Sequence, residues 1–397
     1  MRAGSGGGRL TLLRGCRLFT PKDLGTVDLL LCCGSVAAVE SRIPVPSGLD
    51  VEAVDLSGMI ATPGFVDLHV HLTGGGGEGG FSTRVPEMQL SRMTLAGITT
   101  VVGVLGTDDV SRHPETLLAK VLGLRDEGIT ALMMTGSYQF PPVTLTGSVR
   151  KDIALIEPVI GVGEVALSDH RSSQPTFEDF VRLAAEARVG GLLGGKPGLV
   201  NVHMGGGPAG MDYLFRMLKE TEIPVSQVLP THVTRSAELF EQALGLVEAG
   251  GSIDITASGQ RRSGGVDSSR ALSDLMSRDL PLERVSISSD AGGSLPVFDS
   301  SGVLQGLSVA EPGTLLSEFR RLVREEGFPV TEVLGLFTEN PAGRAGLAGS
   351  KGRIHPGSHA DLLVFDDEWE LRRVYAGGRL MALDGTPVVS GTFESTG

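Results

Sequence analysis

The sequence is poor in cysteine, tryptophan and basic residues, and it has no long apolar run. Its three cysteines are Cys16, Cys32 and Cys33; because an adjacent pair is a poor basis for a disulfide framework, we expect a reducing compartment. Trp369 is the single tryptophan, and the sparse aromatic residues offer no stacking platform for nucleic-acid bases. The apolar stretch at residues 29–39 is far shorter than the roughly 20 residues that a membrane-spanning helix needs.

The chain also lacks an excess of positive charge. It has 34 lysine and arginine residues against 47 aspartate and glutamate residues, which gives a net charge of −13. Nucleic acids and anionic membranes are bound through basic patches, so neither is an expected partner. Apolar residues near the N-terminus are interrupted by Arg9, Arg14 and Arg17, which is not the pattern of a signal-peptide core. We therefore predict a cytoplasmic protein that acts on a small molecule.

The chain is long, and it is rich in apolar residues and in glycine. The 397 residues suit a barrel of about 250 residues with a smaller module. Hydrophobic residues make up 41% and charged residues 20%, a globular balance that can bury a large core. The 57 glycines exceed the average share of roughly 7% and cluster beside apolar runs, where turns between strands and helices need them.

The two ends of the chain share one pattern of short apolar runs separated by turns. This pattern covers residues 9–60 and returns at residues 352–365, 371–381 and 386–393, which predicts strands at both ends. We expect these strands to form one small, discontinuous β-sandwich if the ends meet in space. The predicted domains are residues 1–62 and 347–397 for the sandwich and residues 63–346 for the part between them.

Between the ends, β-type runs alternate with helix-like segments, as in a parallel sheet. The predicted strands are residues 65–72, 99–105, 131–138, 159–167, 199–204, 227–233, 252–256 and 285–290. The predicted helices, which show three- and four-residue apolar spacing, are residues 115–127, 177–187, 237–249, 268–277 and 313–326. Eight strands predict an α/β fold, a (β/α)8 TIM-like barrel with helices outside.

Polar residues at the strand ends predict a metal site. His69 and His71 close the first strand in the run DLHVH, and alternation places both side chains on one face. Further candidates lie in the fourth, fifth, sixth and eighth strands; they are Glu164, His203, His232 and Asp290. A single such residue is commonly a loop anchor, but six of them suit the end of a barrel where active residues gather. Four imidazoles and two carboxylates favour two Zn²⁺ ions.

The order of these residues resembles the amidohydrolase superfamily. More narrowly, the runs VVGVLGTDDVSRHPE (101–115), SDHRS (168–172), GLLGGKP (191–197), LPTHV (229–233) and IDIT (253–256) resemble isoaspartyl dipeptidases. The resemblance implies that His69, His71 and Asp290 bind the more buried metal and that His203 and His232 bind the other. It also implies an octamer, a homo-oligomer that sequence reasoning alone does not predict.

Glu164 is expected to bridge the two Zn²⁺ ions together with a hydroxide. Well-known members of the superfamily use a carboxylated lysine instead, but Lys151 and Lys196 precede their strands, so activity should not require bicarbonate. The alternative is that Glu164 is a strand-end carboxylate paired with Arg171. We expect Asp290 to act as general base toward the metal-activated water. Tyr138 either donates a hydrogen bond to the oxyanion, as the resemblance implies, or packs at the rim of the barrel.

The same resemblance implies the substrate-binding residues. Glu78 in the glycine-rich loop would hold an α-amino group, and Arg171 and Arg235 would bind carboxylates through their planar forks. Neutral hydrogen bonds are expected from three more positions, which are Gly76, Thr107 and Ser294. For each charged residue the alternative is a solvated loop charge. The remaining histidines, His113, His170, His355 and His359, are expected to be structural or superficial.

The predicted activity is hydrolysis of the isopeptide bond of β-aspartyl dipeptides, a small dipeptide substrate. One alternative is a cyclic-amide hydrolase similar to dihydroorotase or hydantoinase, which would share the metals and Asp290 but would not need Glu78 for an ammonium group. Another is a catalytically silent scaffold, which would be expected to have lost metal ligands.

Overall fold

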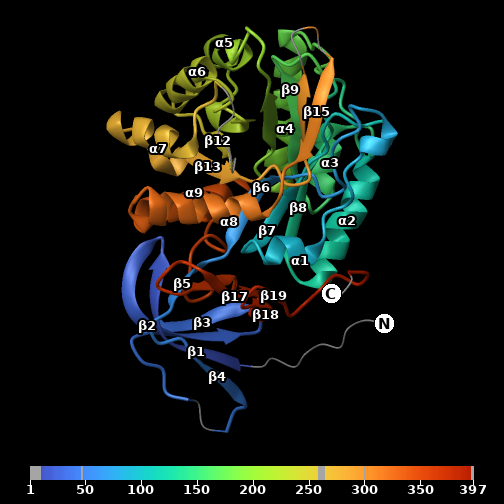
Figure 1. Cartoon of the computed structure of the whole chain (residues 1–397). Helices are drawn as coiled ribbons and strands as arrows, with labels where there is room; N and C mark the ends of the chain where they lie inside the picture. The colour runs from blue at the N-terminus through green and yellow to red at the C-terminus, as the bar shows by residue number, and fades with distance from the viewer. Residues whose placement is uncertain (1–9, 46–47, 258–263, 299–300, 302, 395–397) are drawn as a thin grey trace.

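A computed structural model describes residues 10–45, 48–257, 264–298, 301 and 303–394 (Figure 1). Eight strands carry the middle of the chain: β6 (Phe65–Val70), β7 (Ile98–Gly103), β8 (Thr130–Thr135), β9 (Val159–Leu167), β10 (Leu199–Met204), β11 (Val228–Thr231), β12 (Ile253–Thr256) and β13 (Val285–Ser288). Strands β6 to β11 form one parallel sheet in chain order, and β12 pairs in parallel with β13. All residues of the nine-residue strand β9 are buried, as expected for a parallel sheet covered on both faces.

The barrel closes at two places where the strands share no continuous ladder, between β6 and β13 and between β11 and β12. The backbone N–H of His71, just after β6, donates to the carbonyl of Ala291 after β13 at 2.8 Å. Between β11 and β12, the Thr231 hydroxyl donates to the Asp254 carboxylate at 2.8 Å. The eight strands therefore form the predicted TIM-like barrel, and the structure confirms the fold class.

Helices surround the barrel. They are α1 (Leu90–Thr94), α2 (Pro114–Glu127), α3 (Val149–Leu155), α4 (Phe177–Gly194), α5 (Asp212–Glu220), α6 (Ala237–Glu248), α7 (Ser268–Ser277), α8 (Gly313–Arg320), α9 (Val330–Phe337) and α10 (Glu339–Arg344), with 3₁₀ turns η1 (Phe81–Thr83), η2 (Val225–Gln227) and η3 (Leu282–Arg284) and a π-helical turn η4 (Arg321–Glu325). Side-chain caps fix several starts; for example, Thr176 accepts from the backbone of Asp179 at α4. Among the described helices, none is long and apolar enough to cross a membrane.

Strands from both ends of the chain share one mixed sheet of nine strands, below the barrel in Figure 1. They are β1 (Leu10–Thr20), β2 (Lys22–Cys32), β3 (Ser35–Glu40), β4 (Val51–Asp55), β5 (Ile60–Pro63), β16 (Leu362–Phe365), β17 (Leu371–Ala376), β18 (Arg379–Leu383) and β19 (Thr386–Pro387). β5 and β16 join the two ends as antiparallel neighbours. The turn after β2 also bonds the segment before β16, since the N–H of Ala360 donates to the carbonyl of Gly34 at 2.9 Å, and the sheet encloses a core of its own. The exact domain boundaries stay a prediction.

The nine-stranded sheet forms a β module, which packs against the amino ends of the barrel strands. The predicted site lies at the opposite, carboxyl ends. Phe319 of α8 lies at this junction, where its ring centroid is 5.2 Å from that of Phe65 at the start of β6 and 5.8 Å from that of Phe365 in β16. Phe337 and Trp369 complete the aromatic cluster. The module therefore supports the barrel without contributing to the site.

Several predicted boundaries were wrong. Strands expected to run to positions 72, 105, 138, 233 and 290 end earlier, although the residues that follow them are also buried. At three of these ends a positive φ interrupts the extended backbone, at Gly136, His232 and Asp290. The expected strand at residues 352–365 is confined to β16, and that at residues 386–393 to β19. The helix expected at residues 177–187 continues to Gly194. Helices α1, α3, α5, α9 and α10 were not predicted, nor was the exposed antiparallel hairpin of β14 (Ser294–Phe298) and β15 (Leu304–Val309).

Candidate metal centre and active site

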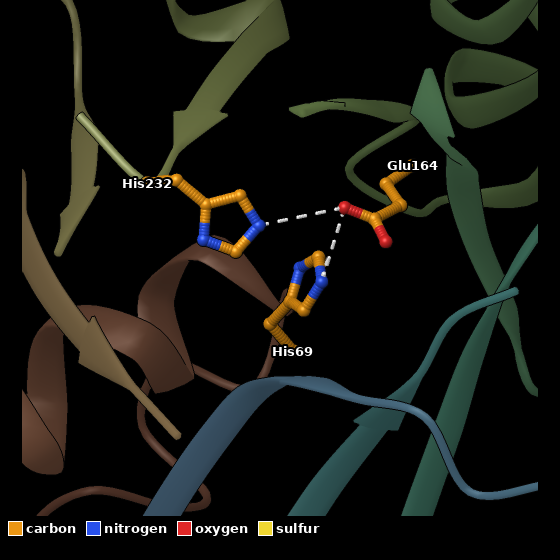
Figure 2. Close-up of side chains that lie close together, drawn as sticks. All are labelled: His69, Glu164 and His232. Carbon is orange, nitrogen blue, oxygen red and sulfur yellow. Dashed lines mark ion pairs between the residues drawn. The ribbon is translucent and has the colours of Figure 1, made fainter. Parts of the chain in front are cut away.

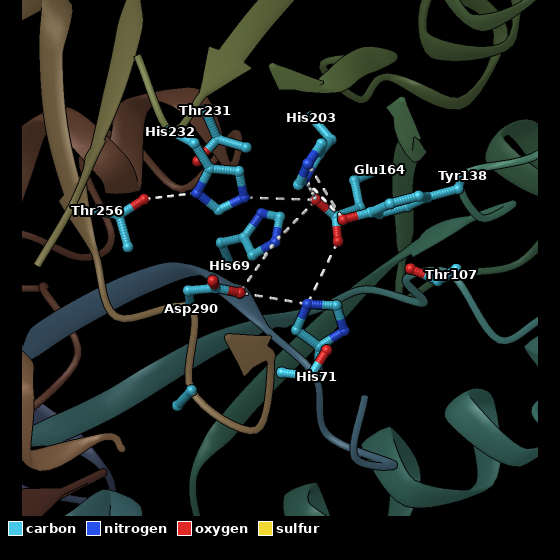
Figure 3. A network of polar contacts seen from close by, with 12 residues as sticks. His69, His71, Thr107, Tyr138, Glu164, His203, Thr231, His232, Thr256 and Asp290 are labelled. Atoms are coloured by element: carbon cyan, nitrogen blue, oxygen red, sulfur yellow. Dashed lines mark hydrogen bonds and ion pairs between the residues drawn. The ribbon is translucent and has the colours of Figure 1, made fainter. Parts of the chain in front are cut away.

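The six predicted metal ligands converge at the carboxyl ends of the barrel strands (Figure 3). His69, Glu164 and His203 lie within strands β6, β9 and β10, so the pleat aims them inward. His232 and Asp290 lie just beyond β11 and β13 and have left-handed backbone angles, φ 62° and φ 57°. Such angles are uncommon outside glycine and gather at functional sites, and here they accompany side chains directed into the barrel.

Glu164 is the centre of this cluster. Its Oε2 atom lies 3.2 Å from Nε2 of His69 and 3.0 Å from Nδ1 of His203, while its Oε1 atom lies 3.2 Å from Nε2 of His71. Figure 2 shows the imidazoles of His69 and His232 both directed at Oε2, the latter at 3.7 Å. The two carboxylate oxygens thus face different sets of imidazoles.

Asp290 lies on the other side of the histidine pair. Its Oδ1 atom is 3.3 Å from Nε2 of His71 and 3.7 Å from Nε2 of His69. Ligand atoms of His69, His71 and Asp290 lie within 4.8 Å of one another, and so do those of His69, Glu164 and His232. The cluster therefore offers two overlapping sets of donors that share His69, and each set could hold a metal ion.

The chemistry of the donor atoms fits metal ions. Buried polar atoms normally have hydrogen-bond partners, but Nε2 of His69 and Oε1 of Glu164 have none with hydrogen-bond geometry. Burial favours neutral His71, yet the adjacent carboxylates of Asp290 and Glu164 raise its pKa to about 10. Burial also acts to raise the pKa of Glu164, but the charge of His69 and the hydrogen bond from His203 hold it well below its usual value. The carboxylates thus attract positive charge, which a divalent cation would supply.

Two polar side chains behind the cluster orient its histidines. Oδ2 of Asp169 lies 3.2 Å from Nε2 of His203, which leaves Nδ1 of that ring directed at Glu164. The hydroxyl of Thr256 lies 2.6 Å from Nδ1 of His232 and leaves Nε2 directed inward. Such outer partners fix the tautomer and rotation of metal-binding imidazoles. Sequence reasoning assigned no role to either residue, although both lie in the motifs that carry the family resemblance.

Tyr138 follows β8 and reaches the cluster instead of packing at the rim. Its hydroxyl lies 2.8 Å from Nδ1 of His203, and its ring lies beside Glu164 in Figure 3. Burial, reinforced by the negative charge of Glu164, raises the pKa of this hydroxyl well above its ordinary value. Tyr138 therefore keeps its proton at neutral pH and can donate a hydrogen bond.

A cavity of about 430 Å³ opens onto the cluster. Its lining includes all seven predicted substrate-binding residues, which are Gly76, Glu78, Thr107, Tyr138, Arg171, Arg235 and Ser294. His71, His203, His232 and Asp290 also line it, whereas Glu164 and His69 lie behind them, wholly buried. His170, expected to be superficial, is exposed but lines the same cavity.

Charged side chains of opposite sign meet in the cavity. The Ser294 hydroxyl lies 2.8 and 2.9 Å from the two carboxylate oxygens of Glu78, and the Thr107 hydroxyl lies 3.4 Å from one of them. Arg171 pairs with Glu78 at 3.4 Å and forms a two-bond fork with Asp169 at 3.0 and 2.9 Å. Arg171 is thus paired with other carboxylates, and the alternative in which Glu164 is its strand-end partner is not what the structure shows.

Comparison with known proteins identifies the family of this chain. Its residues 60–390 match the model of the Amidohydrolase family. The chain belongs to the amidohydrolase family. This amidohydrolase is also similar to the β-aspartyl dipeptidase of Fervidobacterium islandicum AW-1 in the crystal structure of its complex with the β-Asp-Leu dipeptide. The identity is 42%, the TM-score is 0.89, and the match covers 95% of this chain and 98% of that one.

More distant matches cover part of the chain or share only its fold. Dihydroorotase of Mycobacterium tuberculosis is 32% identical over 103 residues, which are 26% of this amidohydrolase and only 22% of the dihydroorotase. A D-hydantoinase shares the fold at 16% identity, with a TM-score of 0.68 and coverage of 97% of both chains. The family model and the β-aspartyl dipeptidase match together confirm the family resemblance and a hydrolytic enzyme.

Proposed function

We propose that this amidohydrolase hydrolyses the isopeptide bond of β-aspartyl dipeptides, which releases L-aspartate and a second amino acid. The main support is that one cavity beside the metal-ligand cluster is lined by the acidic Glu78 and by two arginines, Arg171 and Arg235. A β-aspartyl dipeptide has one free ammonium group and two free carboxylates, so its charges match this set. The similarity to a dipeptidase crystallised with β-Asp-Leu supports the proposal.

The metal centre is proposed to hold two Zn²⁺ ions. His69, His71 and Asp290 would hold one ion, His203 and His232 the other, and Glu164 would contact both. When bound, such ions lower the pKa of water toward neutrality and polarise the scissile carbonyl.

Asp290 and Tyr138 are proposed to handle protons and developing charge. Burial acts to raise the pKa of Asp290, but the charge of His232 and the hydrogen bond from His71 lower it to about 2, so the carboxylate is ionised at neutral pH. It lines the cavity and can take a proton from the attacking water and return it to the leaving amine. The protonated Tyr138 can donate to the carbonyl oxygen as negative charge develops there.

The ends of the substrate are proposed to bind the charged lining residues. Glu78 would accept hydrogen bonds from the α-ammonium group, and the hydroxyls of Ser294 and Thr107, which contact Glu78, would add neutral hydrogen bonds together with the backbone of Gly76. Arg171 and Arg235 would bind the two carboxylates, for which the guanidinium fork is suited.

A cyclic-amide hydrolase is the second candidate, favoured by the dihydroorotase matches. Those matches cover about a quarter of the chain. A cyclic amide such as dihydroorotate has no free ammonium group, so this candidate leaves the buried carboxylate of Glu78 and its two hydroxyl partners without a function. The β-aspartyl proposal uses them all.

Metal content and substrate preference test both candidates together. Wild-type protein, Glu164→Ala and the exposed control Glu283→Ala are assayed for zinc and for hydrolysis of β-Asp-Leu, α-Asp-Leu and dihydroorotate, in bicarbonate-free buffer. We expect two zinc ions per chain and selective cleavage of β-Asp-Leu, lost in Glu164→Ala and kept in Glu283→Ala. If metal-loaded wild type does not cleave β-Asp-Leu but hydrolyses dihydroorotate, the cyclic-amide hydrolase would replace the proposed function.

We further propose a cytoplasmic homo-oligomer, an octamer as the family resemblance implies. Exposed apolar side chains on neighbouring helices support an assembly, because Leu155 at the end of α3 and Leu192 and Leu193 in α4 are 75%, 68% and 70% exposed. Sedimentation of the purified protein tests the octamer, and a monomer at micromolar concentration would contradict it.

A further inference from the structure

The loop that carries Glu78 is a folded structure with two fixed ends. It leaves the barrel at Thr73 and returns at Val85, whose N–H donates to the carbonyl of Gly75 at 2.9 Å. Gly74 has φ 77°, and a Cβ atom there would overlap the Val85 carbonyl, so the two limbs of the loop are in close contact. The position of Glu78 thus depends on what holds these limbs together.

Arg112 holds both limbs at once. This arginine is only 4% exposed and follows β7, outside the loop. Its Nε–H donates to the carbonyl of Thr73 at 3.0 Å, and its Nη2 donates to the carbonyl of Val85 at 2.8 Å. Its Nη1 donates to the carboxylate of Asp108 at 2.8 Å. One guanidinium group therefore joins the first and last residues of the loop to the segment after β7.

Through Asp108, Arg112 also connects the loop to a second part of the cavity wall. Asp108 follows Thr107, whose hydroxyl lies 3.4 Å from Glu78. Ser111 also donates to Asp108, from its backbone N–H at 2.8 Å and from its hydroxyl at 2.5 Å. Arg112 thus fixes the loop relative to a neighbouring residue that touches the Glu78 carboxylate.

We propose that Arg112 is a positioning residue that sets the preference of the cavity for a substrate with a free α-ammonium group, by holding the Glu78 loop in place. The inference rests on the proposed function, in which Glu78 binds that ammonium group. Its three directional donors are used by three different acceptors, a geometry that the single ammonium of lysine cannot reproduce. A displacement of about 1 Å at a binding group can cost up to about 100-fold in activity.

The test compares two competitive inhibitors that differ only in the α-ammonium group, L-aspartate and succinate. Their inhibition constants against β-Asp-Leu hydrolysis are measured for wild type, Arg112→Met, Arg112→Lys and the control Arg84→Met. Arg84 lies in the same loop and its Nε is 3.5 Å from the same Asp108 carboxylate, but it is exposed and bonds neither Thr73 nor Val85. Zinc content is measured in every variant.

We expect Arg112→Met to lose about tenfold or more of the preference for L-aspartate over succinate, with zinc content unchanged and KM affected more than kcat. Arg112→Lys should lose an intermediate amount, and it decides the question if Arg112→Met does not fold. Arg84→Met should keep the wild-type preference. An equal weakening of both inhibitors would show general damage and overturn the inference, whereas wild type that does not cleave β-Asp-Leu would instead overturn the proposed function.

Discussion

Replacing Asp169 by asparagine tests whether one carboxylate links the metal centre to the substrate cavity. Asp169 has a side chain that is 4% exposed. Its Oδ1 accepts from the backbone and Nε of Arg171 at 2.8 and 3.0 Å, and its Oδ2 lies near Nη2 of Arg171 and Nε2 of His203. Because both oxygens face N–H groups, the amide of Asp169→Asn would meet donors in either orientation.

The size of the effect follows from these contacts. A hydrogen bond to a charged group contributes about 1.5–3 kcal/mol, and the substitution removes at least one of them. A loss of about 2 kcal/mol corresponds to about 30-fold. This agrees with the 10- to 100-fold loss of metal affinity or activity that is typical when the outer partner of a metal-binding histidine is changed.

Zinc titration in buffers of fixed free Zn²⁺ measures this directly. We expect Asp169→Asn to bind one of two ions about 30-fold more weakly, since the ion held by His203 depends on the orientation of that ring, and to raise KM because Arg171 loses its partner. The exposed aspartate in Asp212→Asn serves as the matched control. Unchanged affinity for both ions, with KM alone altered, would refute the role of Asp169 in orienting His203.

Three further predictions concern stability, thiol reactivity and metal removal. Phe319→Ala should lower the free energy of unfolding by about 3–5 kcal/mol, measured in urea, because this wholly buried ring joins the barrel to the β module, while Phe393→Ala, which removes a 98% exposed ring, should change it by less than about 0.5 kcal/mol. Burial raises the pKa of the Cys16 thiol to about 11, so little thiolate exists at pH 8; native protein should react rapidly with Ellman's reagent at Cys32 and Cys33 and at a third thiol only after denaturation. Dialysis against a chelator should abolish hydrolysis, and Zn²⁺ should restore it equally with and without bicarbonate; restoration that requires bicarbonate would contradict a glutamate bridge.

The barrel and its metal ligands were predictable from the sequence because they follow from local rules. The alternation of a strand places His69 and His71 on one face, and the carboxyl ends of parallel strands meet at one end of a barrel. The left-handed turns at His232 and Asp290 could not be located, because neither residue is a glycine and both stay buried beyond the strand ends. The hairpin of β14 and β15 was missed because most residues of β15 are exposed and carry no buried stripe.

The outer contacts depend on approaches between loops that no local rule supplies. Asp169, after β9, reaches His203 in the neighbouring strand β10, and Thr256 in β12 reaches His232 after β11. Arg112 was visible only as part of a motif, because its three acceptors come from three separate segments. Sequence spacing predicts which face a side chain occupies, but the partner across a loop is set by the packed structure.

The position of Glu164 also explains why a lysine is not needed between the donor sets. Lys196 uses its ammonium group to donate to the carbonyls of Ile153, Ile156 and Val159, at the start of β9 and thus away from the cluster. Lys151 is exposed on α3. Glu164, in contrast, is wholly buried, with Oε1 toward His71 and Oε2 toward both His69 and His203, so one unmodified side chain reaches imidazoles of both proposed donor sets. In the proposed centre the metal ions would balance its charge, so the proposal needs no carboxylated lysine.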